Sequence, residues 1–236
     1  MSADLLQKAV MFFDIDNCLY HRNKGIELYM KESMEKKPES HTKTVLSPSF
    51  TFKPNTNRYS LVERLCIQYT IDYGLAIRGL IQHHDVDPVD YDIKVDQSLP
   101  IEDLLSRDEK LRQMIQNCSA HRWAFTNAGL PHATRVLKTL GVNDLFEGII
   151  YCDYTEPDFP CKPYPEAYIK AMKMAGVSDP KKCFLVDDSI KNINAAKEMG
   201  WTAILVTESK EHKNVGDAQI EEIYELSAVL PQLFRQ

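Results

Sequence analysis

Five short apolar runs constrain the fold of this chain most strongly. Each is rich in β-branched or aromatic residues, a composition typical of strands that are covered on both faces. None is long enough to cross a bilayer, so burial inside a protein core is the natural explanation. The runs are Val10 to Phe13, Trp123 to Phe125, Ile149 to Cys152, Phe184 to Val186 and Ala203 to Val206.

Helical patterns separate most of these runs. One pattern opens at Pro131 and ends at Gly141, with Val136, Leu137 and Leu140 on its apolar stripe. Two similar patterns follow, from about Pro165 to Gly176 and from Ser189 to Gly200. Because strand and helix alternate, the sequence predicts an α/β fold with a parallel sheet and helices on both faces.

The region between the first two runs breaks this alternation. It extends from about His21 to Cys118, and its longest candidate helix is Leu61 to His84, interrupted by Gly74 and Gly79. An inserted, mainly helical domain explains this length better than one very long loop does. We therefore expect a core of residues 1–20 and 119–236 and an inserted domain of residues 21–118, in which residues 38–60 form a mobile loop.

Composition narrows the range of partners. The net charge is −6 at pH 7 and no stretch is strongly basic, which argues against a polymeric nucleic acid as the partner. The first residues lack the apolar stretch of a signal peptide, and the six cysteines show no closely spaced metal-binding pairs. We expect a soluble protein of the cytoplasm, with entry into the nucleus left open, that has free buried thiols, no membrane association, and a monomeric or small homo-oligomeric state.

Two acids follow the first run directly, in the sequence Phe13-Asp14-Ile15-Asp16-Asn17. Side chains at i and i+2 of a strand point to the same side, so Asp14 and Asp16 can converge on one site. Neighbouring buried carboxylates are costly unless a cation or a shared proton compensates. The alternative is that both acids end the strand and face solvent.

Polar groups also follow the later strands. Thr126 and Asn127 end the second run, Lys162 precedes a helix start after the third, and Asp187 and Asp188 end the fourth. The carboxyl ends of parallel strands meet at one edge of the sheet, where such folds bind ligands. Each residue alone has an ordinary structural explanation, but their order along the chain favours a shared site.

This order of motifs resembles the haloacid dehalogenase superfamily of phosphohydrolases. The resemblance covers residues 10–16 and 123–206, and the inserted region stands where that superfamily carries its cap domain. It implies a Rossmann-like core, a catalytic Mg²⁺ ion and an aspartyl-phosphate intermediate.

A narrower resemblance involves three segments. Residues 12–20, the segment Tyr73-Gly74-Leu75-Ala76-Ile77-Arg78-Gly79-Leu80 and Asp187-Asp188-Ser189 are similar to the fungal and plant pyrimidine 5'-nucleotidase branch of that superfamily. The resemblance implies a nucleoside monophosphate, UMP or CMP, as the substrate. We predict that Tyr69, Tyr73 and Arg78 of the cap contact the base or the sugar; the alternative is that the two tyrosines pack in the core.

The roles follow from the need to bring an anionic nucleophile to an anionic phosphate. At ~4 Å and an effective dielectric of ~20, each pair of unit charges repels by about 4 kcal/mol. Mg²⁺ would bind the Asp14 carboxylate, the Asp16 carbonyl, and Asp187 or Asp188. Lys162 would add positive charge, while Thr126 and the backbone near Asn127 would hold phosphate oxygens.

Asp14 would attack phosphorus, and Asp16 would protonate the leaving oxygen and later take a proton from water. We expect neighbouring carboxylates to keep Asp16 protonated for the first step. Three alternatives stay open: another phosphomonoester such as a phosphosugar or phosphoglycolate, an inactive binding protein of the same fold, and a signalling receiver domain. The motif order and the large insertion argue against the receiver domain.

Overall fold

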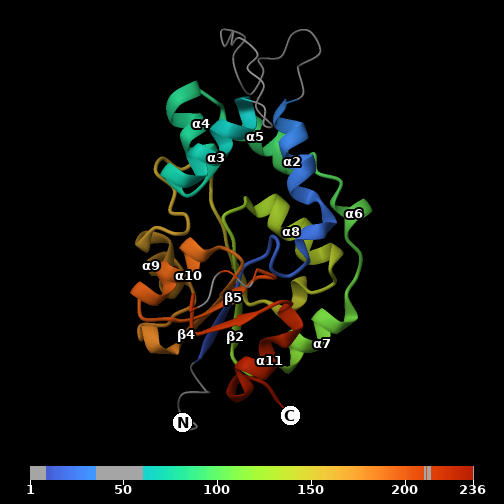
Figure 1. Ribbon diagram of the computed structural model, residues 1–236, viewed down its shortest axis with the longest axis vertical. Coiled ribbons are helices and arrows are strands. Elements are labelled where there is room, and N and C mark those ends of the chain that lie inside the picture. Colours follow the sequence, from blue (N-terminus) through green and yellow to red (C-terminus); the bar gives the residue numbers. More distant parts are fainter. Residues whose placement is uncertain (1–8, 36–60, 210, 212–213, 236) are drawn as a thin grey trace. The chain divides into compact units, whose positions relative to one another are not determined.

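The computed structural model describes residues 9–35, 61–209, 211 and 214–235 (Figure 1), so the expected mobile loop of residues 38–60 lies outside the described part. The described residues form two compact units. The first contains those of Met1–Lys24, Ile101–Cys152 and Pro160–Gln236, and the second contains those of Gly25–Pro100 and Asp153–Phe159.

A parallel six-stranded sheet forms the centre of the first unit and confirms the predicted fold class. The strand order is β3-β2-β1-β4-β5-β6, which places β1 between β2 and β4. All the strand pairs are parallel, so the carboxyl ends of the strands share one edge. The strands are β1 (Val10–Phe13), β2 (His121–Phe125), β3 (Gly148–Ile150), β4 (Cys183–Asp187), β5 (Thr202–Val206) and β6 (Ala218–Ile220).

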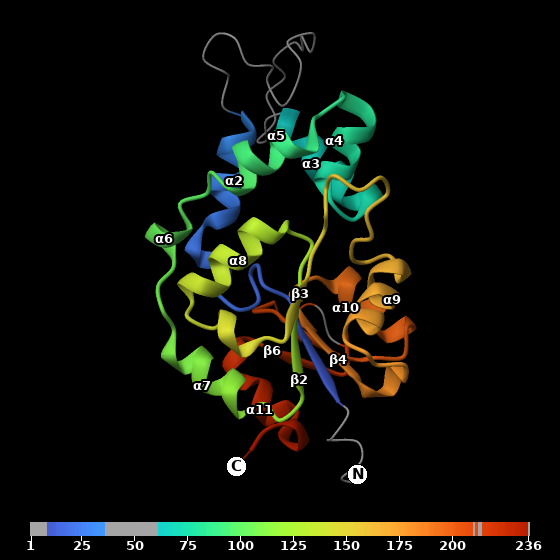
Figure 2. The same cartoon turned by 180° about the vertical axis from the view of Figure 1, so that it is seen from behind.

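Helices cover both faces of this sheet. In Figures 1 and 2, α9 and α10 lie on one face and α7, α8 and α11 on the other. The helices of this unit are α6 (Ile101–Leu104), α7 (Glu109–Asn117), α8 (Leu130–Thr139), α9 (Pro165–Met174), α10 (Ile190–Glu198) and α11 (Leu226–Val229). Short 3-10 helices occupy Arg22–Lys24, Asn143–Leu145, Pro180–Lys182, Ile223–Glu225 and Pro231–Leu233.

Aromatic side chains fill the core between the sheet and the α9–α10 layer. Phe12 of β1 stacks on Trp201 with ring centroids 4.7 Å apart. Tyr168 of α9 makes T-shaped contacts with Phe125 and Trp201, with ring centroids 5.5 and 5.2 Å apart. These packed rings fix the positions of β1 and β2, whose carboxyl ends carry the polar motifs.

The second unit is mainly helical. Its elements are α2 (Ile26–Glu35), α3 (Leu61–Tyr73), α4 (Ala76–His84), α5 (Pro88–Tyr91) and a π-helix at Asp92–Asp96. The long candidate helix of residues 61–84 is therefore two helices, which break at Gly74, whose φ of 74° suits glycine. Gly79 lies inside α4 and does not interrupt it.

The segment after β3 belongs to this second unit. Tyr154 donates a hydrogen bond of 3.0 Å to the buried Asp96 carboxylate, and its ring packs edge-on against Tyr91. Conversely, α6 and α7 belong to the unit of the sheet, whereas we expected the inserted domain to continue to residue 118. The buried stripe of α7 explains its place, because Leu111, Met114 and Ile115 pack into the core of that unit.

Candidate active site

The carboxyl edge of the sheet brings together the acids and the lysine that the sequence singled out. Lys162 Nζ lies 2.8 Å from Asp14 Oδ1 and 2.6 Å from Asp187 Oδ2. It also donates to the Phe125 carbonyl at 2.6 Å. All three polar side chains are buried, so the lysine is held between two carboxylates with a backbone acceptor for its third proton.

Asn127 holds the backbone of Lys162 in place. Its Nδ2 donates to the Lys162 carbonyl and its Oδ1 accepts from the Lys162 N–H, both at 2.8 Å. The side chain of Asn127 therefore supports the lysine loop, while the predicted phosphate contact involves the backbone N–H groups near Asn127.

Thr126 is buried at the end of β2. Its Oγ1 accepts a hydrogen bond of 3.0 Å from the Ala128 N–H, which fixes the turn before α8. A hydroxyl retains its own proton as a donor when its oxygen accepts, so Thr126 can still bind a phosphate oxygen.

The two acids that end β4 have different surroundings. Asp187 is fully buried: its Oδ1 accepts from the Ser189 N–H at 2.8 Å, and Asn192 Nδ2 reaches both of its oxygens at 3.0 and 3.1 Å. Asp188 is partly exposed, and Arg22 donates to its Oδ2 at 2.8 Å. Asp187 is thus fixed by protein donors, whereas Asp188 is the more available ligand.

Burial and neighbouring charges shift the pKa values of Asp14, Asp188 and Lys162. Burial raises the pKa of Asp14 well above its ordinary value, and the charges of Asp187 and Asp188 add to this, although Lys162 opposes it. Burial and the charge of Asp187 raise the pKa of Asp188 to about 6. Burial lowers the pKa of Lys162, but the charges of Asp14 and Asp187 outweigh burial and raise it.

The donor set fits a magnesium ion. Asp14, Asp187 and Asp188 can each offer one oxygen, and these atoms lie within 4.8 Å of one another. Hard carboxylate oxygens are the ligands that Mg²⁺ takes, and a divalent cation would relieve the repulsion among these three carboxylates. By geometry, Asp14 and Asp188 would bind the ion directly, while Asp187 holds the lysine and α10.

Asp16 lies apart from this cluster. Its Oδ1 accepts from Tyr20 OH at 2.6 Å and lies 2.8 Å from His132 Nε2. Burial raises the pKa of Asp16, but the charge and hydrogen bond of His132, together with the hydrogen bond of Tyr20, lower it below its ordinary value. This differs from our expectation, because a histidine and a tyrosine face Asp16 where we expected neighbouring carboxylates.

The three cap residues lie on two neighbouring helices of the second unit, Tyr69 and Tyr73 on α3 and Arg78 on α4. Tyr69 and Tyr73 of α3 stand 5.8 Å apart, and their hydroxyls hydrogen-bond His84 and His83 of α4 at 2.7 and 2.6 Å. Arg78 lies over the ring of Phe159 at 5.6 Å. The two tyrosines thus join α3 to α4, and Arg78 lies against the segment after β3.

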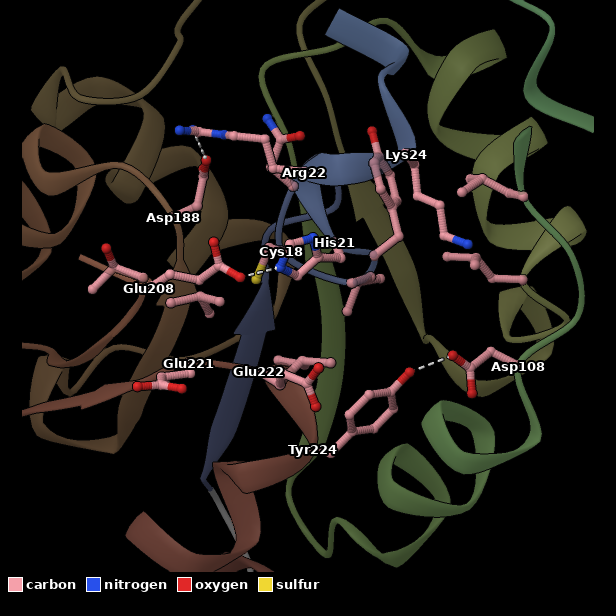
Figure 3. A pocket seen from close by; sticks show the side chains of 18 of the residues that line it. Cys18, His21, Arg22, Lys24, Asp108, Asp188, Glu208, Glu221, Glu222 and Tyr224 are labelled. Carbon is pink, nitrogen blue, oxygen red and sulfur yellow. Dashed lines mark hydrogen bonds and ion pairs between the residues drawn. The ribbon is translucent and has the colours of Figure 1, made fainter.

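A cavity of about 680 Å³ opens beside Asp188 (Figure 3). Loops after β1, β4, β5 and β6 line it, together with residues 105–109. Across it, His21 Nε2 lies 2.6 Å from Glu208, and Tyr224 donates to Asp108. Its lining reaches Asp188 but does not contain the Lys162 cluster, so it adjoins the candidate active site.

Sequence reasoning missed Tyr20, His132 and Asn192 as site residues. Tyr20 lies in the bend after β1, whereas His132 and Asn192 are polar residues near the start of helical stripes that otherwise face the core. His132 stands one turn before Val136 on the buried stripe of α8, and Asn192 stands beside Ile193 on that of α10. A buried polar position on an apolar stripe, in a helix that follows a motif strand, is the signal that could have found them.

The structure thus places a buried aspartate, bonded to a lysine and beside two further acids, at the carboxyl end of the central strand of a parallel sheet. The haloacid dehalogenase-like hydrolase family model matches residues 8–200, and the chain belongs to this family. The family resemblance stated from the motifs is therefore confirmed.

One curated relative is Phosphate metabolism protein 8 of Saccharomyces cerevisiae, which is 34% identical over 209 residues. The match covers 84% of this chain but only 61% of the relative, so the chain spans about three fifths of that protein's length.

Solved structures share the fold at low identity. CbbY of Rhodobacter sphaeroides, solved in complex with phosphate, has a TM-score of 0.63 at 16% identity, covering 95% of this chain and 99% of that one. The HAD-hydrolase YfnB of Bacillus subtilis, solved with magnesium bound, has a TM-score of 0.62 at 15% identity, covering 95% and 99%.

None of the described helices is long and apolar enough to cross a bilayer.

Proposed function

We propose that this hydrolase is a magnesium-dependent phosphatase that transfers phosphate to Asp14 and acts on pyrimidine nucleoside monophosphates. The observation that supports the chemistry is the position of Asp14, which is buried, bonded to Lys162 and next to Asp187 and Asp188. A carboxylate in such a place can attack an anionic phosphate only where cations offset the charge, and this site supplies a lysine and a set of metal ligands.

In the first step, an Asp14 oxygen forms a bond to phosphorus as the bond to the sugar oxygen breaks. Lys162 balances charge on the phosphate and on Asp14, and Thr126 with the backbone N–H groups at the start of α8 holds the phosphate oxygens. Mg²⁺, when bound, neutralises the phosphate and keeps the Asp14 carboxyl ionised. Asp16 gives its proton to the leaving sugar oxygen from its acid form, which its lowered pKa makes the minor form at neutral pH.

In the second step, water attacks phosphorus and the bond to Asp14 breaks. Asp16, now a carboxylate, takes the proton of the attacking water, which returns the site to its first state. The separation of Asp16 from the three-carboxylate cluster supports this division of labour, because a carboxylate committed to the metal could not carry a proton.

The nucleotide assignment depends on the cap motif. The second unit offers Arg78 on α4 and Phe159 on the segment after β3, a cation and a ring that suit a sugar and a base. Tyr69 and Tyr73 stay candidates for the same contact, although their hydroxyls already bond histidines of α4.

The test is phosphate release from UMP, CMP, AMP, GMP, phosphoglycolate and several sugar phosphates, with Mg²⁺ and with EDTA. Release that needs Mg²⁺, favours UMP and CMP and vanishes in Asp14→Asn is the expected result. Release from sugar phosphates alone would keep the chemistry and remove the nucleotide assignment. No release from any ester would favour an inactive protein of this fold.

The cap residues are tested separately by Arg78→Ala. We expect this change to raise the KM for UMP more than the KM for p-nitrophenyl phosphate, because only the nucleotide has a base and sugar to bind. Lys138→Ala, an exposed change on α8, is the matched control. Equal effects of Arg78→Ala on both substrates would make it a scaffold residue.

A further inference from the structure

Asp16 is held from two elements that are distant in the sequence. Tyr20 reaches it because a turn after Asp14, closed by the Leu19 N–H to the Ile15 carbonyl at 3.0 Å, returns the chain over residue 16. His132 reaches it from the first turn of α8. Both contacts go to Oδ1, and among the described residues no group donates to Oδ2.

The burial of His132 calls for an explanation. It is 1% exposed and occupies the end of an apolar stripe with Ala133, Val136 and Leu137. An aliphatic side chain would fill this place without the cost of removing an imidazole from water. The hydrogen bond to Asp16 offsets that cost, so the position is adapted to the carboxylate rather than to packing alone.

We infer that His132 and Tyr20 are positioning residues for Asp16, which hold Oδ1 so that Oδ2 is the oxygen that exchanges protons with the substrate and with water. The inference rests on the proposed function and deepens it. In the acid form, the proton lies on Oδ2 because Oδ1 already accepts two hydrogen bonds. The Asp16 side chain is 31% exposed, and Oδ2 is the oxygen that the two contacts leave unengaged.

This arrangement gives the proton a defined path. In the first step the proton on Oδ2 moves to the leaving oxygen as the ester bond breaks, and in the second step Oδ2 receives a proton from the attacking water. Without the two donors the carboxyl can rotate, and the proton is no longer aimed at the reacting oxygen.

The experiment compares kcat/KM for a series of phosphate esters with leaving groups of rising basicity, from p-nitrophenyl through phenyl to alkyl phosphate. A good leaving group needs no proton, whereas an alkoxide does. For His132→Leu we expect a loss of about 10²-fold with the alkyl ester and little change with p-nitrophenyl phosphate. Tyr20→Phe should show the same trend more weakly, and His132→Gln, which keeps an N–H donor, should recover part of the loss.

Two controls separate positioning from stability. Val136→Ala weakens the same stripe of α8 without touching Asp16, so its activity should fall equally, if at all, with every ester. Asp16→Ala should show the steep dependence on the leaving group, and adding His132→Leu to it should change kcat/KM no further.

The outcomes distinguish the proposed role of Asp16 from the positioning role of His132. If Asp16→Ala itself treats all the esters alike, the proposed role of Asp16 fails. If Asp16→Ala shows the dependence but His132→Leu lowers kcat/KM uniformly, and lowers it again in the Asp16→Ala background, only the positioning role is overturned. Thermal unfolding of each variant identifies any that fail to fold. If His132→Leu fails to fold, the dependence of kcat/KM on the leaving group in His132→Gln tests the positioning role instead.

Discussion

Lys162 is the buried cation that balances two carboxylates of this site. It is buried between Asp14 and Asp187. An uncharged side chain of similar length would fill the same space, so it is the charge of Lys162 that this position requires. Removing its charge leaves two carboxylates close together without their cation. A buried ion pair that loses one partner is far more costly than the pair itself is stabilising.

We therefore predict that Lys162→Met lowers the free energy of unfolding by about 3–5 kcal/mol in the absence of Mg²⁺. Saturating Mg²⁺ should recover part of this loss, because it supplies charge to the same acids. Chemical denaturation with and without Mg²⁺ measures both effects. Lys138→Met is the control, since this exposed lysine should change stability by no more than about 0.5 kcal/mol. A Lys162→Met protein as stable as its parent would contradict the electrostatic account.

The thiols give a second prediction at the scale of single residues. All six cysteines are free, and Cys66 alone is not buried. Burial raises the pKa values of Cys18 and Cys118, and burial with the charge of Asp179 raises that of Cys183 to about 12. Because the thiolate is the reactive form, iodoacetamide at pH 8 should modify Cys66 well before the others.

Peptide mapping by mass spectrometry at timed intervals measures this order. The unfolded protein, in which all six thiols should react at similar rates, is the control. Modification of Cys183 in the folded protein as fast as that of Cys66 would show that the core around β4 opens readily.

The sequence predicted the acids and the lysine better than it predicted their partners. Asp14, Lys162 and Asp187 follow strands in a parallel sheet, so topology alone brings them to one edge. The contact of His132 with Asp16 depends on which face α8 presents to the loop after β1, and the chain between the two residues does not reveal this. A single sequence thus does not predict which side chains of different elements contact one another.

At the scale of elements, the sequence predicted the strongly apolar strands and missed the one with a polar residue at its centre. The five apolar runs became β1 to β5, β1 with the predicted bounds and the others with ends shifted by at most two residues. β6 (Ala218–Ile220) was not predicted, because it is short and contains a polar Gln219 at the edge of the sheet. Pairing with β5 holds it, aided by Asp217, whose carboxylate accepts from the Ala203 N–H at 2.8 Å.

The packing of α3 against α4 allows a test of what Tyr69 does. A Cβ atom at residue 79 would overlap the ring of Tyr69, so the close approach of these helices requires glycine there. We predict that Gly79→Ala destabilises the protein by about 1–3 kcal/mol through overpacking. Adding Tyr69→Ala should remove this penalty, because the smaller side chain leaves room.

Urea unfolding of the two single variants and the double variant measures the coupling. Kinetics on the same proteins then address substrate binding: if Tyr69 only packs, Tyr69→Ala leaves the ratio of KM for UMP to KM for p-nitrophenyl phosphate unchanged. Additive effects of Gly79→Ala and Tyr69→Ala on stability would mean that the two residues are not the contact that the structure shows.

At the scale of the whole molecule, we expect the site to couple metal binding to folding. Burial and the charge of Asp187 raise the pKa values of Asp14 and Asp188, so the charged forms of these two acids oppose the folded state. The unfolded chain separates them and loses any high-affinity site for a divalent cation. A ligand that binds only the folded state stabilises it in proportion to the logarithm of its concentration over its Kd.

We predict that Mg²⁺ raises the midpoint of thermal unfolding. At a Mg²⁺ concentration of about 100 times Kd, the added stability is about 2.7 kcal/mol, which for a domain of this size corresponds to a shift of about 5–10 °C. Asp188→Asn should lose most of the shift, because Asp188 is the most exposed of the three acids and so the most available ligand. Asp103→Asn, an exposed change on α6, should keep it. Calorimetry across a Mg²⁺ titration measures all three proteins. An equal shift in the Asp188→Asn variant would mean that the ion stabilises the fold from elsewhere and that these carboxylates are not its site.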